Sequence, residues 1–506
     1  MAFLACNSNC LSKVPDSRRW NKNIKEQVLK GNAKKAILTY INMKELGLHA
    51  DNYTFPPLLQ AAADLSSSFT ALALHGQTIK TGFCCHLFVQ TALLNMYSSL
   101  GFIGDAHNVF ENMPLKDVVA WNSMLDAYVS SEQMDNATLL FHSMPLKDLS
   151  SFNIMISGYA NMGRTVSARS IFDQIPTKDT VSWNSMILVH TNAGDMVEAH
   201  KLFKELPVKN IITWNTMVRG YVRNELYAEA VDLFEEMRAG NVKPDFLTMT
   251  DVLSACAHLG SLERGNKLHI YAKDCRLDSS PHVTTALIVM YAKCGSTLKA
   301  LEVFYKSQCK DIYCWNAIIA GLGFHGYGYS ALKLYDKMRE NCIMPDDITF
   351  IGLLNACAHA GLVEDGCQLF NSMEKEFGIS PKIEHYGCMV DLLSRAKLLD
   401  RAFQLIQAMP FEPGESILGA LLSACVIHRD LDTGEKLMKL YFARTRQFSD
   451  GEFMMFANLY AAFGKWEEAN RWRDKMNNSG IAKTTGCSII EVNGRIHKFL
   501  AGESRI

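Results

Sequence analysis

The stretch WNSM occurs at residues 121–124 and again at 183–186, and related aromatic–amide pairs begin at Phe152, Trp214 and Trp315. The amides of the first four of these pairs are spaced 31 residues apart; they are Asn122, Asn153, Asn184 and Asn215. Self-similarity at a fixed period is the signature of a repeat architecture. The 506 residues are therefore better interpreted as one repeated unit than as several independent domains.

Each unit carries two helical patterns. In one, an alanine is followed four residues later by an aromatic residue and three residues after that by an apolar one, which places all three on one helical face. The four clearest examples are Ala137, Phe141 and Met144; Ala168, Phe172 and Ile175; Ala199, Phe203 and Leu206; and Ala230, Phe234 and Met237. The WNSM-type stretch opens the other helix, where Trp121, Met124 and Ala127 share a face.

Prolines separate the units. The stretch MPLKD begins at Met113 and at Met144, IPTKD at Ile175 and LPVKN at Leu206. Proline lacks a backbone donor and disfavours helix in the residue before it, so we expect a helix to end just before each of these prolines. Because one helical hairpin cannot bury its own apolar face, the hairpins should stack into a solenoid.

The composition fits a folded protein and excludes some functions. Hydrophobic residues make up 48% and charged residues 20%, which argues against wholesale disorder. The net charge of -1 argues against nucleic-acid binding through a blanket of positive charge, but allows a local basic groove. The fifteen cysteines include no CxxC pair and are interpreted as reduced core thiols, and the uncharged runs 81–104 and 312–332 as buried repeat helices rather than membrane spans.

The period alternates in an ordered way along the chain. From Asn215, the equivalent position moves by 35, 35, 31, 35 and 36 residues to Thr250, Thr285, Asn316, Ile351 and Gly387. In the other direction from Asn122, it moves by 31, 35 and 35 residues to Thr91, Pro56 and Asn21. Twelve units then fill residues 17–413.

This alternation resembles the plant pentatricopeptide-repeat family, in particular its PLS subclass of standard, long and short repeats. VLSACAHLGSLERG from Val252 and LLNACAHAGLVEDG from Leu353 look like long repeats, and MYAKCGSTLKALEVF from Met290 looks like a short one. Residues 414–482 resemble the helical motifs of the C-terminal E-type extension, followed by a tail at 483–506. The resemblance implies an all-α fold, a right-handed superhelical solenoid of helix-turn-helix repeats.

The two ends of the chain carry weaker signals. Residues 1–16 with Arg18 and Arg19 have some character of an organellar presequence. Near the other end, IIEVNGRIHKFL predicts a small β-hairpin, because Asn493-Gly494 favours a tight turn between apolar flanks. A frayed terminal segment without a sheet is the alternative.

The amide beside each core aromatic needs a partner or solvent. A helix N-cap is one explanation, but it does not account for Asn or Thr at this position in eight units whose last residue is Asp or Asn. In the resembled family, these two positions read one RNA base per repeat. The resemblance therefore implies RNA-binding pairs at Asn21/Asp51, Thr91/Asp117, Asn122/Asp148, Asn153/Asp179, Asn184/Asn210, Asn215/Asp245, Thr285/Asp311 and Asn316/Asp346.

The family's code then gives an expected target. Asn/Asp pairs imply uridine, Thr/Asp pairs guanosine and Asn184/Asn210 a pyrimidine, so the expected RNA is U-N-G-U-U-Y-U-N-G-U-N-N. Four pairs depart from the code and leave their bases open; they are Pro56/His86, Thr250/Ser280, Ile351/Lys382 and Gly387/Pro413. Apolar side chains at the second position of the units are expected to wedge between bases, or else only to cover a neighbouring helix; they include Tyr53, Val119, Val181, Ile212 and Tyr313.

The function implied by the resemblance is recognition of single-stranded organellar RNA, most directly as a site-recognition factor for C-to-U editing. Its partners would be a DYW-type deaminase acting in trans and accessory editing proteins, in the mitochondrion or alternatively the chloroplast. Splicing or stabilisation of RNA and a helical protein-binding scaffold are the alternatives. No enzyme, cofactor, metal or membrane association is expected, since the chain lacks an HxE motif and a CxxC pair, and GLGFHG from Gly321 lacks the preceding strand of a dinucleotide site.

Overall fold

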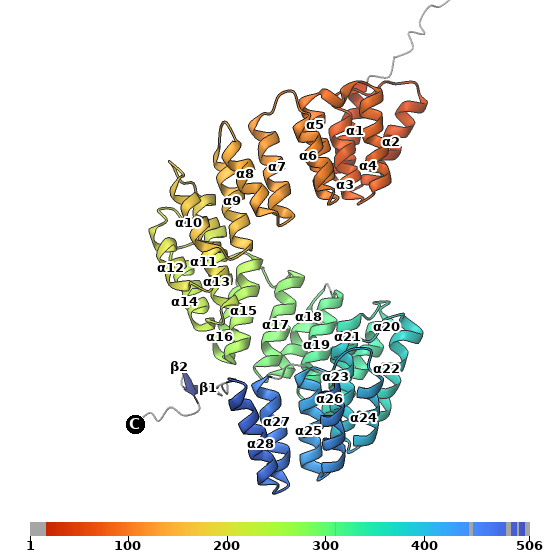
Figure 1. Ribbon diagram of the computed structural model, residues 1–506, viewed down its shortest axis with the longest axis vertical. Coiled ribbons are helices and arrows are strands. Elements are labelled where there is room, and N and C mark those ends of the chain that lie inside the picture. Colours follow the sequence, from red (N-terminus) through yellow and green to blue (C-terminus); the bar gives the residue numbers. More distant parts are fainter. Residues whose placement is uncertain (1–16, 309, 445–448, 482–486, 493–494, 501–506) are drawn as a thin grey trace, which may run out of the picture. The chain divides into compact units, whose positions relative to one another are not determined.

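Antiparallel pairs of short helices follow one another along the chain in the computed structural model (Figure 1). The structure describes residues 17–308, 310–444, 449–481, 487–492 and 495–500. They divide into two compact units, Met1–Gly220 and Tyr221–Ile506, with the boundary inside helix α13. The expected all-α solenoid of helical hairpins is confirmed within each unit.

The first unit runs from α1 into α13. Its helices are α1 (Ser17–Leu29), α2 (Ala33–Glu45), α3 (Phe55–Asp64), α4 (Ser68–Lys80), the short η1 (Phe83–Cys85), α5 (Leu87–Ser99), α6 (Ile103–Glu111), α7 (Val118–Ser130), α8 (Met134–Ser143), α9 (Leu149–Asn161), α10 (Thr165–Asp173), α11 (Thr180–Asn192), α12 (Met196–Glu205) and α13 (Ile211–Arg223). The first helices of successive hairpins pack side by side, as α3 does on α1 and α5 and as α9 does on α7 and α11.

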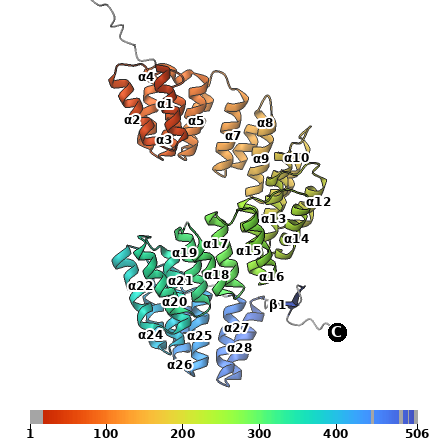
Figure 2. The same ribbon diagram turned by 180° about the vertical axis from the view of Figure 1, so that it is seen from behind.

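The second unit is also built of antiparallel helix pairs, up to α28, as the reverse view in Figure 2 shows. Its helices are α14 (Tyr227–Ala239), α15 (Phe246–Leu259), α16 (Leu262–Asp274), α17 (Pro281–Lys293), α18 (Thr297–Lys306), α19 (Ile312–Phe324), α20 (Gly328–Glu340), α21 (Asp347–Ala360), α22 (Val363–Phe377), α23 (Ile383–Arg395), α24 (Leu399–Ala408), α25 (Glu415–His428), α26 (Leu431–Arg444), α27 (Asp450–Ala462) and α28 (Trp466–Asn478). Here too α15, α17, α19, α21, α23, α25 and α27 form a continuous row of first helices.

The helix ends follow from local sequence. Helices α6, α8, α10 and α12 end two or three residues before Pro114, Pro145, Pro176 and Pro207, as the sequence predicts. Within a hairpin, the turn from the first helix to the second contains a residue in the left-handed region, such as Gly194 with φ of 79°. Glycine adopts this conformation without the steric cost that a side chain imposes.

The predicted helical faces form the core. All twelve residues of the four alanine–aromatic–apolar sets are buried, and so are Met124 and Ala127 of the WNSM helix. The phenylalanine of each set lies edge-on to the aromatic residue of the next hairpin. Phe141 meets Phe152 with ring centroids 5.4 Å apart, and Phe172 meets Trp183 at 5.2 Å with an interplanar angle of 79°.

A lysine covers the same phenylalanine from the turn that precedes the next hairpin. The ammonium of Lys178 lies 5.0 Å from the ring centroid of Phe172 and donates a hydrogen bond to the carbonyl of Ile175 at 3.0 Å. Four other lysines make the same pair of contacts; they are Lys116, Lys147, Lys209 and Lys310. The turn is thus tied to the core by a cation–π contact as well as by a hydrogen bond.

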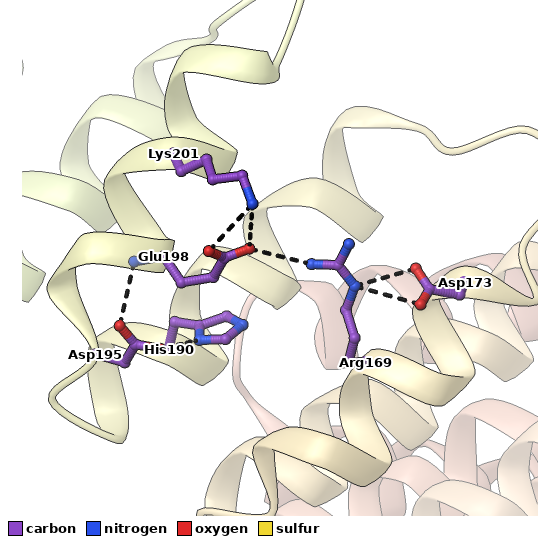
Figure 3. A network of polar contacts seen from close by, with 6 residues as sticks. All are labelled: Arg169, Asp173, His190, Asp195, Glu198 and Lys201. Carbon is purple, nitrogen blue, oxygen red and sulfur yellow. Dashed lines mark hydrogen bonds and ion pairs between the residues drawn. The ribbon is translucent and has the colours of Figure 1, made fainter.

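Ion pairs also join the second helices of neighbouring hairpins. Arg169 of α10 contacts Asp173 in its own helix at 3.1 Å and Glu198 of α12 at 3.4 Å, and Lys201 contacts Glu198 at 3.1 Å (Figure 3). These side chains are partly exposed to solvent, so each pair contributes little to stability.

The last hairpins share one core with the repeats before them. Buried side chains from α23 through α27 form a single cluster, with Leu393, Leu418, Leu437 and Phe456 among them. The division between repeats at 17–413 and an extension at 414–482 stays a prediction, because the packing is continuous across residue 413.

The predicted β-hairpin is confirmed. Strand β1 (Cys487–Val492) pairs antiparallel with β2 (Arg495–Leu500), and Val492 lies opposite Arg495. Asn493 and Gly494, on which the turn prediction rests, lie outside the described residues, as does the N-terminal segment 1–16. In the part of the chain that is described, no helix has both the length and the apolar character needed to cross a membrane.

Replacing Phe172 by alanine should lower the free energy of unfolding by about 3–5 kcal/mol, because it leaves a cavity against Trp183. Val166 in the same helix is 83% exposed, so Val166→Ala should change it by less than about 0.5 kcal/mol. Urea unfolding followed by circular dichroism measures both variants. Equal effects of the two substitutions would contradict the assignment of Phe172 to the inter-repeat core.

Candidate functional site

Aspartates at the ends of the repeat units are the helix N-caps. The carboxylate of Asp148 accepts a hydrogen bond from the backbone N–H of Ser151 at 2.9 Å. The same bond forms at five other first helices, where the caps are Asp117, Asp179, Asp245, Asp311 and Asp346. The asparagines that follow the aromatic residues, such as Asn122, the fifth residue of α7, lie inside the helices and are called fifth-position residues below. The N-cap explanation of these amides is therefore wrong, since the aspartate is the cap.

The structure brings several of the predicted pairs into direct contact. The Nδ2 of Asn122 donates to the Oδ1 of Asp148 at 3.0 Å, although 26 residues separate them. The other amides donate likewise: Asn21 to Asp51 at 2.9 Å, and Asn316 to Asp346 at 3.0 Å. These amides therefore have an intramolecular partner in the free protein, which the sequence alone does not reveal.

A buried hydroxyl completes each of these three contacts. The Oγ of Ser151, three residues after Asp148, donates to the Oδ1 of Asn122 at 2.7 Å and also lies 2.9 Å from the carboxylate. Thr54 and Thr349 occupy the same place beside Asn21 and Asn316, at 2.8 and 2.6 Å. The predicted site omits these hydroxyls, although a Ser or Thr three residues after the aspartate is visible in the sequence as half of a capping box.

The hydrogen bonds set the ionisation of the carboxylates. Burial by itself would raise the pKa of Asp148, but the bonds from Asn122 and from the N–H and hydroxyl of Ser151 bring it below its usual value. The pKa of Asp179 is lowered in the same way: burial opposes the shift, while bonds from Ser182 and Asn153 cause it. Both aspartates therefore present ionised acceptors at neutral pH.

Two asparagine amides are only partly satisfied. The Oδ1 of Asn153 and that of Asn184 are both buried and have no hydrogen-bond partner among the described residues. Beside Asn184, the side-chain oxygen of Asn210 accepts from the backbone and hydroxyl of Thr213 at 2.9 Å each. Asn184 and Asn316 are only 9% and 6% exposed, so these amides lie deeper in the surface than we expected.

The remaining pairs are arranged differently. The hydroxyl of Thr91 donates to the backbone of Leu87 at 3.0 Å, and that of Thr285 lies 3.1 Å from the thiol of Cys314, whose pKa burial raises to about 11. Their partners Asp117 and Asp311 cap α7 and α19. Asn215 and Asp245 belong to different units; Asp245 caps α15 through Thr248 at 2.9 Å.

The pair Asn122/Asp148 opens onto a groove along the row of first helices. This groove has a volume of about 570 Å³ and is lined by polar side chains of α3, α5, α7 and α9, including Gln60, Asn95 and Asp126. Burial raises the pKa of Asp126. The second-position side chains are exposed, with Tyr53 at 68% and Tyr313 at 62%. They therefore do not serve only to cover a neighbouring helix.

In the described part of the chain, no group of three or more histidine, cysteine, aspartate or glutamate side chains is placed to hold a metal ion. The described cysteines are free thiols. What the site offers is a series of amides, hydroxyls and carboxylates, one set for each of the eight predicted pairs, which suits hydrogen bonding to a ligand that is itself periodic.

Comparison with known proteins identifies the family. The model of the PPR repeat matches residues 91–118, 119–149, 150–179, 181–211, 283–312, 348–376 and 384–411, and that of the PPR repeat family matches 209–258 and 310–359. A pentatricopeptide repeat-containing protein of Arabidopsis thaliana is 48% identical over 489 residues, which are 96% of this chain and 81% of the relative. The chain belongs to the pentatricopeptide repeat family. The E motif model also matches, at residues 430–491.

Other members of the pentatricopeptide repeat family extend the comparison. One from Arabidopsis thaliana is 35% identical over 92% of this chain and 77% of its own length. Another, whose name places it in the chloroplast, is 43% identical over 52% of this chain and 48% of its own length. The crystal structure of the maize repeat protein PPR10 has the same fold, with a TM-score of 0.56, 18% identity and coverage of 92% of this chain and 74% of that one.

Replacing Asp148 by alanine should lower the free energy of unfolding by about 1 kcal/mol at pH 7, because it removes an N-cap. Since the pKa of Asp148 is lowered on folding, its contribution is present above the unfolded pKa of about 3.9 and is lost as the pH falls through the folded value. The difference between the two proteins should therefore shrink in acid. Asp148→Asn keeps a capping side chain and serves as the control for lost charge.

Thermal unfolding from pH 7 down to pH 3 measures the three proteins side by side. An alanine variant as stable as the wild type at pH 7 would contradict the capping role. A stability difference that grows as the pH falls would contradict the direction of the pKa shift.

Proposed function

We propose that this protein binds single-stranded RNA with one nucleotide facing each repeat, and that the polar pairs described above select the bases. The observation that carries the proposal is the contact between fifth-position amides and N-cap carboxylates from consecutive hairpins, as in Asn122 and Asp148. The fold adds support, since PPR10 was also crystallised with an 18-nucleotide psaJ RNA element and in that form has a TM-score of 0.52 to this chain.

The donor and the acceptor that remain on the asparagine amide explain how such a pair would recognise uracil. The amide of Asn122 uses one N–H on Asp148 and one lone pair on Ser151, which leaves one N–H and one lone pair. The edge of uracil presents carbonyl acceptors and one imino donor, so the remaining donor and acceptor are complementary to it. A threonine with an aspartate offers a hydroxyl and a carboxylate, which suits the imino and amino donors of guanine.

The proposed base-reading residues are those of the eight pairs from Asn21/Asp51 to Asn316/Asp346, and the proposed target is U-N-G-U-U-Y-U-N-G-U-N-N. The exposed second-position side chains, such as Tyr53 and Tyr313, would separate successive bases by stacking or apolar contact. With a net charge of -1, the protein would gain its selectivity from these base contacts more than from general attraction to phosphates.

The finer role we propose is site recognition for C-to-U editing of organellar transcripts. The E motif match at residues 430–491 supports this role over splicing or stabilisation by occupancy alone. The repeats would recognise the RNA sequence at the editing site. A deaminase acting in trans, together with accessory proteins, would catalyse the deamination. This chain itself would be non-catalytic. The compartment proposed is the mitochondrion, with the chloroplast as the alternative.

RNA binding is tested by a gel shift with the proposed twelve-nucleotide target. A copy with guanosine at the fourth and tenth positions should bind about 10- to 100-fold more weakly, because each mismatch costs about 1 kcal/mol or more. Equal affinities for the two RNAs would contradict the proposal of sequence-specific recognition.

The base assignment is tested by Asn122→Thr. This substitution recreates the Thr/Asp pair and should shift the preference at the fourth base from uridine toward guanosine by about 10-fold. The tenth base, which faces Asn316, serves as the control and should keep its uridine preference. An unchanged preference at the fourth base would remove the assignment for that repeat.

The editing role is tested by sequencing organellar transcripts from plants that lack the protein. Loss of one or a few C-to-U conversions next to the proposed target is the expected result. Intact editing with altered splicing or transcript abundance would favour the second candidate. Purified protein incubated with zinc and the RNA should produce no uridine, and conversion under these conditions would overturn the non-catalytic role.

A further inference from the structure

A hydroxyl accompanies every asparagine of the base-reading set. The residue three positions after the paired Asp or Asn is Ser or Thr in all six asparagine pairs; these residues are Thr54, Ser151, Ser182, Thr213, Thr248 and Thr349. After the threonine pairs Thr91/Asp117 and Thr285/Asp311, the same position holds Ala120 and Cys314. The presence of the hydroxyl thus follows the identity of the fifth-position residue.

A requirement for capping does not explain this division. Asp117 caps α7 through the backbone of Ala120 at 2.8 Å, and Asp311 caps α19 through that of Cys314 at 2.9 Å, without a hydroxyl in either case. The aspartate cap therefore forms with or without the hydroxyl. The asparagine sets and the threonine sets differ in the group that faces this position. Only the asparagine sets have an amide oxygen there that needs a hydrogen-bond donor.

The hydroxyls cannot contact RNA themselves. Ser151, Thr54 and Thr349 are all fully buried, with relative exposure of 0%. Each reaches the amide oxygen of its asparagine at 2.6–2.8 Å. Any effect on base selection must therefore pass through the orientation of the amide.

The amide is held from both ends. In the Asn122 set, the carboxylate of Asp148 accepts from Nδ2 while Ser151 donates to Oδ1. Rotating the amide by 180° would bring its oxygen against the carboxylate oxygen, which is repulsive, and would leave the Ser151 hydroxyl with only the carboxylate of Asp148 as an acceptor. Without the hydroxyl, the amide oxygen would lose this donor, and the amide would have a weaker preference for one orientation.

We propose that the buried Ser or Thr three residues after the paired position is a third specificity-determining residue, which positions the asparagine amide for uracil through the bond from its hydroxyl. It is a positioning residue that does not touch the base, and the proposal rests on the proposed RNA-binding function. In the Asn153 and Asn184 sets, the hydroxyls of Ser182 and Thr213 bond to Asp179 at 2.6 Å and to Asn210 at 2.9 Å, and both amide oxygens are unpartnered among the described residues. These two amides are less constrained, so their base selection should be weaker than that of Asn122.

The test uses Ser151→Ala in the full chain and four RNAs that differ only in the fourth base. The ratio of affinities for uridine over the other three bases should fall about 3- to 10-fold, which corresponds to the loss of one hydrogen bond. The ratio at the tenth base, which faces Asn316, should not change. Ser151→Thr keeps the hydroxyl and should restore the wild-type ratio.

A double-mutant cycle separates positioning from a structural effect. A merely structural loss would weaken binding to all four RNAs alike and leave their ratios unchanged, which would overturn the proposal. In an Asn122→Thr background, Ser151→Ala should have no effect on the ratios, because the threonine has no amide to orient. That double variant reproduces the native set Thr91, Asp117 and Ala120, so it is expected to fold.

Two further outcomes have distinct meanings. If Ser151→Ala does not fold, Thr349→Ala tests the same bond beside Asn316, read at the tenth base. If the wild-type protein shows no preference for uridine at either base, the base-reading function itself is wrong. If the wild type prefers uridine and both alanine variants keep its full ratio, only the positioning role is overturned.

Discussion

The edge-to-face contact between the phenylalanine of one hairpin and the aromatic residue that opens the next is the constraint on which the rest depends. A pair of 9- to 13-residue helices such as α7/α8 or α9/α10 has too little buried surface to be stable alone. The ring of Phe172 against Trp183, repeated at each short unit, gives every hairpin a neighbour at a set distance. Folding of one hairpin is thereby coupled to the next.

The same contact also determines the spacing of the polar groups. Lys147 lies over the ring of Phe141 and binds the carbonyl of Met144, and the next residue in the chain is the N-cap Asp148. The turn that carries the cap is therefore anchored to the aromatic core by its own lysine. Any ligand that meets one polar set per hairpin meets them at intervals fixed by core packing rather than by the polar groups themselves.

In the proposed RNA-binding role, hydrogen bonding within the free protein would orient the site rather than block it. Asn122 uses one of its two N–H groups on Asp148 and one of its two oxygen lone pairs on Ser151, so one donor and one acceptor remain. Fixing the amide before the ligand arrives reduces the ordering cost that binding would otherwise impose. The lowered pKa of Asp148 has a related origin, since, against the opposing effect of burial, the Asn122 amide and the backbone N–H of Ser151 donate to its carboxylate.

The sequence by itself determined the repeat, its two helical faces, the ends of the helices before proline and the pairs of polar positions. All of these features are periodic, and a period can be read from the sequence alone. The buried sets around Phe141 and Phe172 and the strand pairing of Cys487–Val492 with Arg495–Leu500 follow from such local patterns. Only the tertiary structure decided that Asn122 bonds to Asp148 across 26 residues and that Ser151 joins them. Those contacts depend on how closely one hairpin packs on the next, and the distance between two packed helices is set by the shapes of all the buried side chains together.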